Sequence, residues 1–116
     1  MKNEEPVLDM KDVLDRVQDD RELLMELLEI FQDDFIQRRK NLQDALDEND
    51  AQVVREVAHA IKGASGNISA KRIFLLCHKM EKAAQAGFLD EVRRDLPSLD
   101  EQFQILQKYI KTIHST

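Results

Sequence analysis

The sequence predicts an all-α protein, an antiparallel four-helix bundle with a short additional N-terminal helix. Three observations support this. The 116 residues include only 3 Gly and 2 Pro, so turns are few and the elements are long. Apolar side chains recur every three or four residues along most of the chain, the spacing of amphipathic helices. No segment has the alternation of a strand, and long helices joined by short loops pack as antiparallel neighbours.

The first half of the chain contains three expected helices. We expect residues 1–8 to be a polar lead-in, mobile or loosely docked, and residues 9–116 to form a single domain. A short helix begins after Asp9, a suitable N-cap residue, and a long helix runs from about residue 20 to residue 47. Asp50 then caps a third helix, whose apolar positions extend to Ile68 with a break near Gly66 and Asn67.

The second half contains two more expected helices. Ser69 is the expected N-cap of the fourth helix, and Gly87 follows that helix as a C′ residue. The last apolar pattern runs from Val92 to Ile113 and contains Pro97, which predicts a kink or a fresh helix start.

Composition excludes several classes of protein. The chain has 17 Lys+Arg and 23 Asp+Glu, a net charge of −6, which argues against nucleic-acid binding. A single cysteine, Cys77, excludes an intrachain disulfide and a multi-cysteine zinc site, and it fits a reducing compartment. There is no apolar run of membrane-spanning length and no signal peptide. We therefore expect a cytoplasmic monomer that does not contact the membrane.

The third helix carries the candidate functional residues. With Ile61 at the centre of its buried stripe, His59 lies about 160° away and faces solvent. Gly63 follows His59 at i+4 and Gly66 at i+7, although a glycine inside a helix costs roughly 1 kcal/mol relative to alanine. A bare patch of this kind admits another protein close to the imidazole.

Two cations stand within reach of His59, Arg55 at i−4 and Lys62 at i+3. They are suited to neutralise a bound phosphoryl group and to keep the imidazole neutral and nucleophilic. The pattern indicates a histidine presented for transfer of an anionic group. The simpler alternatives are a surface histidine without a role and a Gly66 that only ends the helix. A helix that continues through Ile68 weakens this simpler interpretation, because Gly63 would then be interior and could not be a cap.

The segment His59-Ala-Ile-Lys62-Gly63-Ala-Ser-Gly66-Asn-Ile-Ser69-Ala resembles the signature of histidine-containing phosphotransfer (HPt) domains of two-component phosphorelays. The resemblance extends over nearly the whole chain. It implies a helical bundle whose exposed histidine accepts a phosphoryl group on Nε2 from the aspartyl phosphate of a receiver domain and passes it to another receiver. One position departs from the pattern: Ser69 stands where the family usually has glycine. We expect serine to cap the next helix there without a positive φ.

The resemblance also implies roles for individual residues. His59 is the expected phosphoacceptor, Lys62 the cation beside the phosphoryl group, and Glu81 a residue that accepts a hydrogen bond from Nδ1–H. Arg55, Gly63 and Gly66 are expected at the docking surface for the receiver. No intrinsic cofactor is implied, since Mg²⁺ would be carried by the receiver. The partners are receiver domains of a hybrid histidine kinase or of response regulators. The chain lacks a nucleotide-binding fingerprint, so we expect a phosphocarrier without kinase activity.

Two other functions fit parts of the pattern. Glu56 and His59 form a Glu-x-x-His motif, as in di-iron bundles, but neither of the other histidines has a glutamate three residues earlier and His59 faces outward. A non-catalytic helical adaptor would explain the bundle without explaining the residues around His59. Ile30 and Ile36 lie outside the apolar stripe of the second helix, as lateral core contacts or as part of a docking patch.

Overall fold

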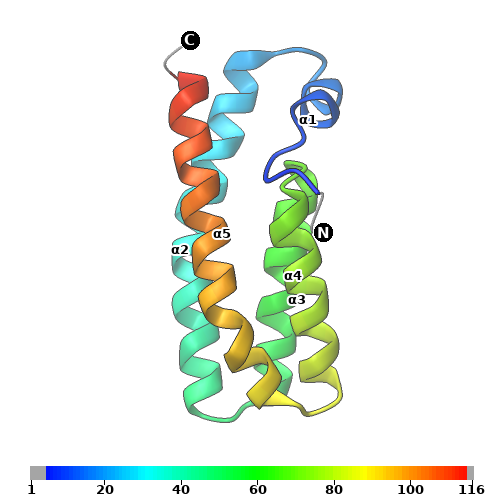
Figure 1. Cartoon of the computed structure of the whole chain (residues 1–116), viewed down its shortest axis with the longest axis vertical. Coiled ribbons are helices and arrows are strands. Elements are labelled where there is room, and N and C mark those ends of the chain that lie inside the picture. The colour runs from blue at the N-terminus through cyan, green and yellow to red at the C-terminus, as the bar shows by residue number, and fades with distance from the viewer. Residues whose placement is uncertain (1–4, 115–116) are drawn as a thin grey trace.

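The computed structural model describes residues 5–114. The first four residues of the expected lead-in (1–8) and residues 115 and 116 lie outside this range. Five helices follow one another, and no strand occurs among the described residues. They are α1 (Met10–Arg16), α2 (Arg21–Asp47), α3 (Ala51–Asn67), α4 (Lys71–Gln85) and α5 (Leu89–His114). Helices α2–α5 run alternately up and down as an elongated bundle, and α1 lies near the end of the bundle where α3 passes into α4 (Figure 1). The predicted fold class is confirmed.

Aspartate side chains cap the first three helices. The carboxylates of Asp9, Asp20 and Asp50 accept hydrogen bonds from the backbone N–H groups of Asp12, Leu23 and Val53. Each bond satisfies a donor that a helix start leaves without an intrahelical partner. The N-caps predicted at Asp9 and Asp50 are confirmed, and so are the predicted bounds of the long second helix.

The predicted start of the fourth helix is wrong by one residue. Its N-cap is Ala70, with no side-chain capping bond, and Ser69 instead follows Ile68, the C-cap residue of α3, with a φ of 61°. The Ala70 N–H donates to the Ser65 carbonyl and the Ser69 N–H to the Gly66 carbonyl, the two bonds of a Schellman motif. The motif needs a left-handed residue at the position of Ser69, so the expectation of a serine without positive φ is also wrong.

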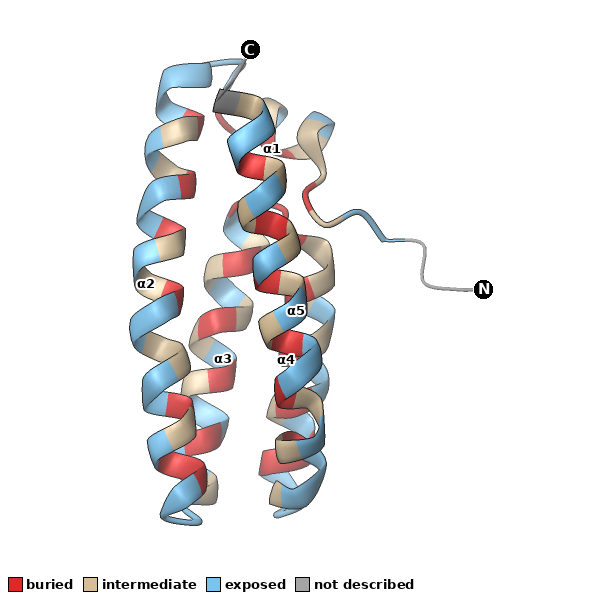
Figure 2. Cartoon of the chain, turned by 60° about the vertical axis from the view of Figure 1, so that its left-hand side comes forward, coloured by how far each residue is buried: buried red, intermediate tan, exposed pale blue. Residues whose placement is uncertain are grey.

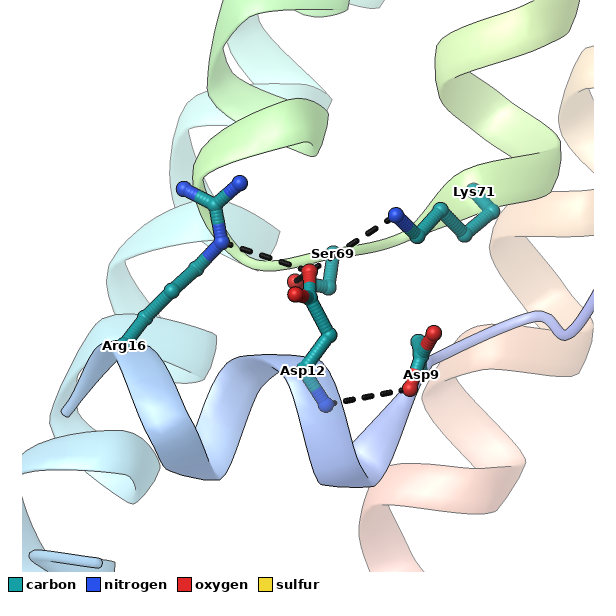
Figure 3. Close-up of polar contacts among 5 residues, drawn as sticks. All are labelled: Asp9, Asp12, Arg16, Ser69 and Lys71. Carbon is teal, nitrogen blue, oxygen red and sulfur yellow. Dashed lines mark hydrogen bonds and ion pairs between the residues drawn. The ribbon is translucent and has the colours of Figure 1, made fainter. Parts of the chain in front are cut away.

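Contacts with α1 compensate for the strained conformation of Ser69. The buried Ser69 hydroxyl donates to Asp12 Oδ2 at 2.5 Å, and the Asp9 N–H donates to the Ser69 carbonyl at 2.9 Å. Arg16 Nε and Lys71 Nζ lie 3.3 and 3.6 Å from the same Asp12 oxygen (Figure 3). The hydrogen bond from Ser69, aided by these cations, lowers the pKa of Asp12 below its ordinary value. The loop between α3 and α4 is thus attached to α1.

Helix α5 continues through Pro97 as one element, so the proline does not start a new helix. Gly87 precedes α5 with a φ of 84°, as expected of a C′ glycine after α4. Asn49 adopts a positive φ of 55° in the turn between α2 and α3. The Arg93 guanidinium reaches from α5 to this turn, where Nη2 donates to the Leu46 carbonyl and to Asn49 Oδ1. These bonds attach the first turns of α5 to the turn between α2 and α3.

The core runs the length of the bundle, with the buried stripes of the long helices facing one another (Figure 2). Between α2 and α5, Phe35 stacks on Phe103 with ring centroids 4.0 Å apart, and Phe31 lies beside both. Leu8, which the sequence assigned to the lead-in, is 4 % exposed and belongs to this core. Ile30 and Ile36 are 63 % and 58 % exposed, so they are not lateral core contacts.

Candidate functional site

The candidate site lies on the face shared by α3 and α4. The two helices are antiparallel neighbours, joined by the short turn around Ser69 (Figure 1). His59 and Lys62 lie on α3, with His59 on the side away from the buried Ile61 and Lys62 nearer the buried Ala58. The His59 side chain is 66 % exposed, as its angular position predicted. Glu81 approaches it from α4, where it follows the buried Met80.

A hydrogen bond fixes the orientation of the imidazole. His59 Nδ1 lies 2.8 Å from Glu81 Oε2, and the Glu81 side chain is only 14 % exposed. An ionised carboxylate has no proton to donate, so Nδ1 carries the hydrogen and donates it to Glu81. In the neutral ring the lone pair then resides on Nε2. The sequence anticipated this contact only through the family resemblance, because 22 residues separate the two side chains.

Lys62 keeps Glu81 ionised. Its Nζ atom lies 2.6 Å from Glu81 Oε1, and the lysine side chain is 19 % exposed. Burial by itself raises the pKa of Glu81, but the interactions with Lys62 and then with His59 outweigh burial and bring the pKa below its ordinary value. Each carboxylate oxygen therefore has its own partner. The resting site contains an ion pair beside the imidazole, whereas the sequence had indicated only that two cations, Arg55 and Lys62, stand within reach of it.

The three predicted docking residues, Arg55, Gly63 and Gly66, differ in how open their surroundings are. Arg55 is exposed one turn before His59 and lines a surface hollow with Gln52 and Gln85. At Gly63 a β-carbon would meet no other atom within 4 Å, so the helix surface there is open. At Gly66 a β-carbon would lie 3.3 Å from the Phe74 ring. Gly66 thus makes room for a side chain of α4, and this contact gives no support to its predicted docking role.

Sequence reasoning missed one pair of residues beside this face. The rings of Phe74 and His78 are nearly parallel, at 5°, with centroids 6.5 Å apart. His78 stands three residues before Glu81 on α4, which is the i, i+3 spacing of side chains on one helix face. That spacing was visible in the sequence, but only the pairing of α4 with α3 shows that this face borders His59. Cys77, by contrast, is buried and free, as predicted for a small core residue.

The described part of the chain contains neither a metal-binding cluster nor a membrane-spanning helix. Within residues 5–114, no group of three or more His, Cys, Asp or Glu side chains is arranged to hold a metal ion. Of the helices in the same range, none is long and apolar enough to cross a membrane. The Glu56 and His59 pair of the di-iron alternative thus gains no further ligand from the described side chains.

Comparison with known proteins gives a consistent result. Residues 26–115 match the Hpt domain family. A solved structure of histidine-containing phosphotransfer protein B (HptB) from Pseudomonas aeruginosa PAO1 is similar, with a TM-score of 0.88, 27 % identity, and coverage of 95 % of this chain and 96 % of that one. The HPT domain of a sensor hybrid histidine kinase from Shewanella has the same fold, with a TM-score of 0.78, 20 % identity and 94 % coverage of both chains. No curated protein sequence matches.

The family match covers most of the chain, so the protein belongs to the Hpt domain family. Its class is that of the histidine phosphotransfer domains of phosphorelays, which act as phosphoryl carriers and interact with receiver domains.

Proposed function

We propose that His59 is the phosphoacceptor of this carrier. It receives a phosphoryl group from the aspartyl phosphate of one receiver domain and passes it to the aspartate of another. The observation that supports this assignment is the pairing of a 66 % exposed imidazole with a largely buried carboxylate on Nδ1. The pairing leaves the lone pair on Nε2, the nitrogen that is not bound to Glu81. Lone-pair nitrogen and solvent access are the two requirements of a nucleophile that acts on another protein.

The transfer step follows from this tautomer. The Nε2 lone pair attacks phosphorus, a phosphorus–nitrogen bond forms, and the bond between phosphorus and the aspartate oxygen breaks. The aspartate departs as a carboxylate, and the ring becomes a phosphorylated imidazolium. The second half-reaction reverses the step with the aspartate of the other receiver. Mg²⁺ held by the receiver's carboxylates would neutralise the phosphoryl oxygens, so this chain supplies no metal ligand of its own.

The neighbouring residues have supporting roles in the proposal. Lys62 lies one turn after His59 and keeps Glu81 charged, and it is the nearest cation for the transferred group. Gly63 leaves the helix surface open for the receiver, and the exposed Arg55 extends the docking surface beyond His59, whereas Gly66 packs against Phe74. The exposed Ile30 and Ile36 are candidates for an outer part of that surface.

We further propose that the protein has no kinase activity and works as a monomer in the cytoplasm. Incubation with ATP and Mg²⁺ alone should leave it unlabelled, and sedimentation should give the mass of one chain. The buried, unpaired thiol of Cys77 is consistent with a reducing compartment.

A transfer assay tests the assignment of His59. The wild-type protein is mixed with a receiver that carries radiolabelled phosphate, in the presence of Mg²⁺, and should acquire label that is stable in alkali and lost in acid. His59→Gln should acquire none. His78→Gln is the matched control, because it removes the histidine nearest in sequence on α4 and should be labelled like the wild type. Label retained by His59→Gln would refute the assignment, and a wild type that binds receivers without labelling would be an adaptor.

A further inference from the structure

The geometry points to a second task for Glu81, which rests on the function proposed above. We infer that its carboxylate retains the Nδ1 proton of His59 after phosphorylation, so that the phosphorylated ring stays cationic until the phosphoryl group leaves. Glu81 acts through the imidazole and does not touch phosphate, so it is a positioning residue. It would therefore serve release of the phosphoryl group as well as its acceptance.

The chemistry of release explains why this proton matters. When Nε2 forms its bond to phosphorus, the ring gains a positive charge and still carries the Nδ1 hydrogen. If that proton were lost to solvent, the departing group in the next step would be an imidazolate anion, which leaves poorly. With the proton retained, the receiver's aspartate oxygen bonds to phosphorus, the phosphorus–nitrogen bond breaks, and a neutral imidazole departs. No proton then needs to enter or leave during either half-reaction.

The surroundings of Glu81 suit this task. The distance of 2.8 Å from Nδ1 to Oε2 is that of a charge-assisted hydrogen bond once the ring is cationic. Only 14 % of the Glu81 side chain is exposed, so water screens the interaction weakly. Lys62 Nζ lies 2.6 Å from the other oxygen, which keeps the carboxylate ionised while His59 cycles between its two states. An adjacent negative charge favours the cationic ring.

Other titratable groups near His59 and Glu81 form no hydrogen bond or ion pair with the Glu81 carboxylate among the described residues. Within the described residues, the hydrogen bonds and ion pairs of the Glu81 carboxylate are with His59 and Lys62. Burial, followed by the nearby charge of Glu81, raises the pKa of Cys77 to about 12, so this thiol stays neutral. The remaining titratable neighbours are Arg55 and Glu56 on α3, His78 and Lys82 on α4, and the Lys79–Asp95 ion pair between α4 and α5. Of these, His78 is the other imidazole, and the test below removes it.

The first test needs no receiver. Protein with His78→Gln, with and without Glu81→Gln, is phosphorylated by phosphoramidate, a small chemical donor, and the phosphohistidine is followed by ³¹P and ¹⁵N NMR as the pH is raised. The glutamine amide oxygen still accepts a hydrogen bond from Nδ1–H but has no charge. With Glu81 present, the ring should keep its Nδ1 proton to a pH about one unit higher. Equal titration midpoints in two folded proteins would overturn the inference.

The second test follows transfer to a receiver. With Glu81 the rate should stay nearly constant to a pH about one unit higher than without it. With Glu81→Gln it should fall by up to about tenfold per pH unit above the new midpoint. Parallel pH profiles would overturn the inference. If the phosphoryl group is transferred but the titration midpoints are equal, the role of Glu81 is refuted and the proposed function stands. If the midpoint is shifted but no receiver accepts the phosphoryl group, the proposed function is refuted and the effect of Glu81 on the ring stands.

Discussion

At the scale of single residues, the glycines of α3 have different surroundings. Gly63 faces open space one turn after His59, whereas Gly66 lies against the Phe74 ring. Both positions are inside a helix that runs from Ala51 to Asn67, where glycine is about 1 kcal/mol less favourable than alanine. For Gly66 the packing of α4 accounts for the absence of a side chain. For Gly63 nothing in the described residues does, which is why we place a partner there.

A bulky residue at position 63 should slow phosphoryl transfer from a receiver without disturbing the fold. Gly63→Leu should keep the circular dichroism of the helices and at least the wild-type stability, because a β-carbon there meets no other part of the structure within 4 Å and leucine is a better helix former than glycine. Transfer from a receiver should slow by roughly tenfold or more, since overfilling a packed contact costs about 1–3 kcal/mol. Gly63→Ala is the control, and should raise stability by about 0.5–1 kcal/mol in urea unfolding with a smaller effect on transfer. Unchanged transfer by Gly63→Leu would show that no partner approaches this position.

The strain at Ser69 can be measured by two substitutions. Ser69→Ala and Ser69→Gly both remove the hydroxyl that donates to Asp12, so both should be less stable than the wild type. Only glycine adopts a φ of 61° without steric cost. Ser69→Gly should therefore be more stable than Ser69→Ala by about 1 kcal/mol in urea unfolding. Equal stabilities of the two variants would mean that the left-handed conformation of this residue carries no cost.

At the scale of elements, the contact between α2 and α5 depends on aromatic packing. Phe35 is 2 % exposed and stacks on Phe103, and the Arg39 guanidinium forms two bonds to the Asp100 carboxylate beside these rings. Ion pairs at the surface contribute little, with a median of about 0–1 kcal/mol. We therefore expect the aromatic cluster to contribute more to this helix contact than the ion pair does.

Truncation of one ring tests the importance of the cluster. Phe35→Ala should lower the free energy of unfolding by about 3–5 kcal/mol, since it removes a buried ring and leaves a cavity. Phe88→Ala is the matched control, because Phe88 is 56 % exposed in the turn before α5 and its loss should change stability by less than about 0.5 kcal/mol. Urea unfolding followed by circular dichroism measures both. A small loss for Phe35→Ala would assign the α2–α5 contact to other residues.

At the scale of the whole molecule, two carboxylates join separate elements. Asp12 attaches α1 to the loop between α3 and α4, and Glu81 joins α4 to α3. The pKa of Asp12 is lowered below 3.8, mainly by the hydrogen bond from Ser69. The pKa of Glu81 is lowered below 4.5, because Lys62 and His59 outweigh burial. Each group thus adds stability that is complete above its unfolded-state pKa and is lost as the pH falls through its folded-state pKa.

Acid should therefore weaken the bundle below about pH 4.5, the upper of the two unfolded-state values. The midpoint of thermal unfolding should be nearly constant from pH 7 to about pH 5 and then fall. Asp12→Asn should be less stable than the wild type at pH 7, and this difference should be smaller at an acid pH below the lowered folded-state pKa of Asp12, where the wild-type carboxylate is protonated. A difference that is the same at both pH values would show that the charge of Asp12 makes no contribution.

Local chemistry made much of this protein predictable from its sequence. Helix number, the caps at Asp9 and Asp50, and the exposed position of His59 depend on residues within a few turns of one another, and each was predicted correctly. The start of α4 was not, because the φ of Ser69 is set by the Schellman motif of α3 and stabilised by Asp12, 57 residues away. A carboxylate so distant in sequence leaves no local signal.

The sequence by itself determined the bundle and the residues of the phosphotransfer signature, since helical periodicity and motif spacing are properties of short segments. Only the tertiary structure decided how those residues are paired. It placed the Glu81 carboxylate between His59 and Lys62, turned Gly66 toward Phe74, and left Gly63 open. These outcomes depend on the register between α3 and α4, which results from the packing of the whole core and is not encoded in either helix alone.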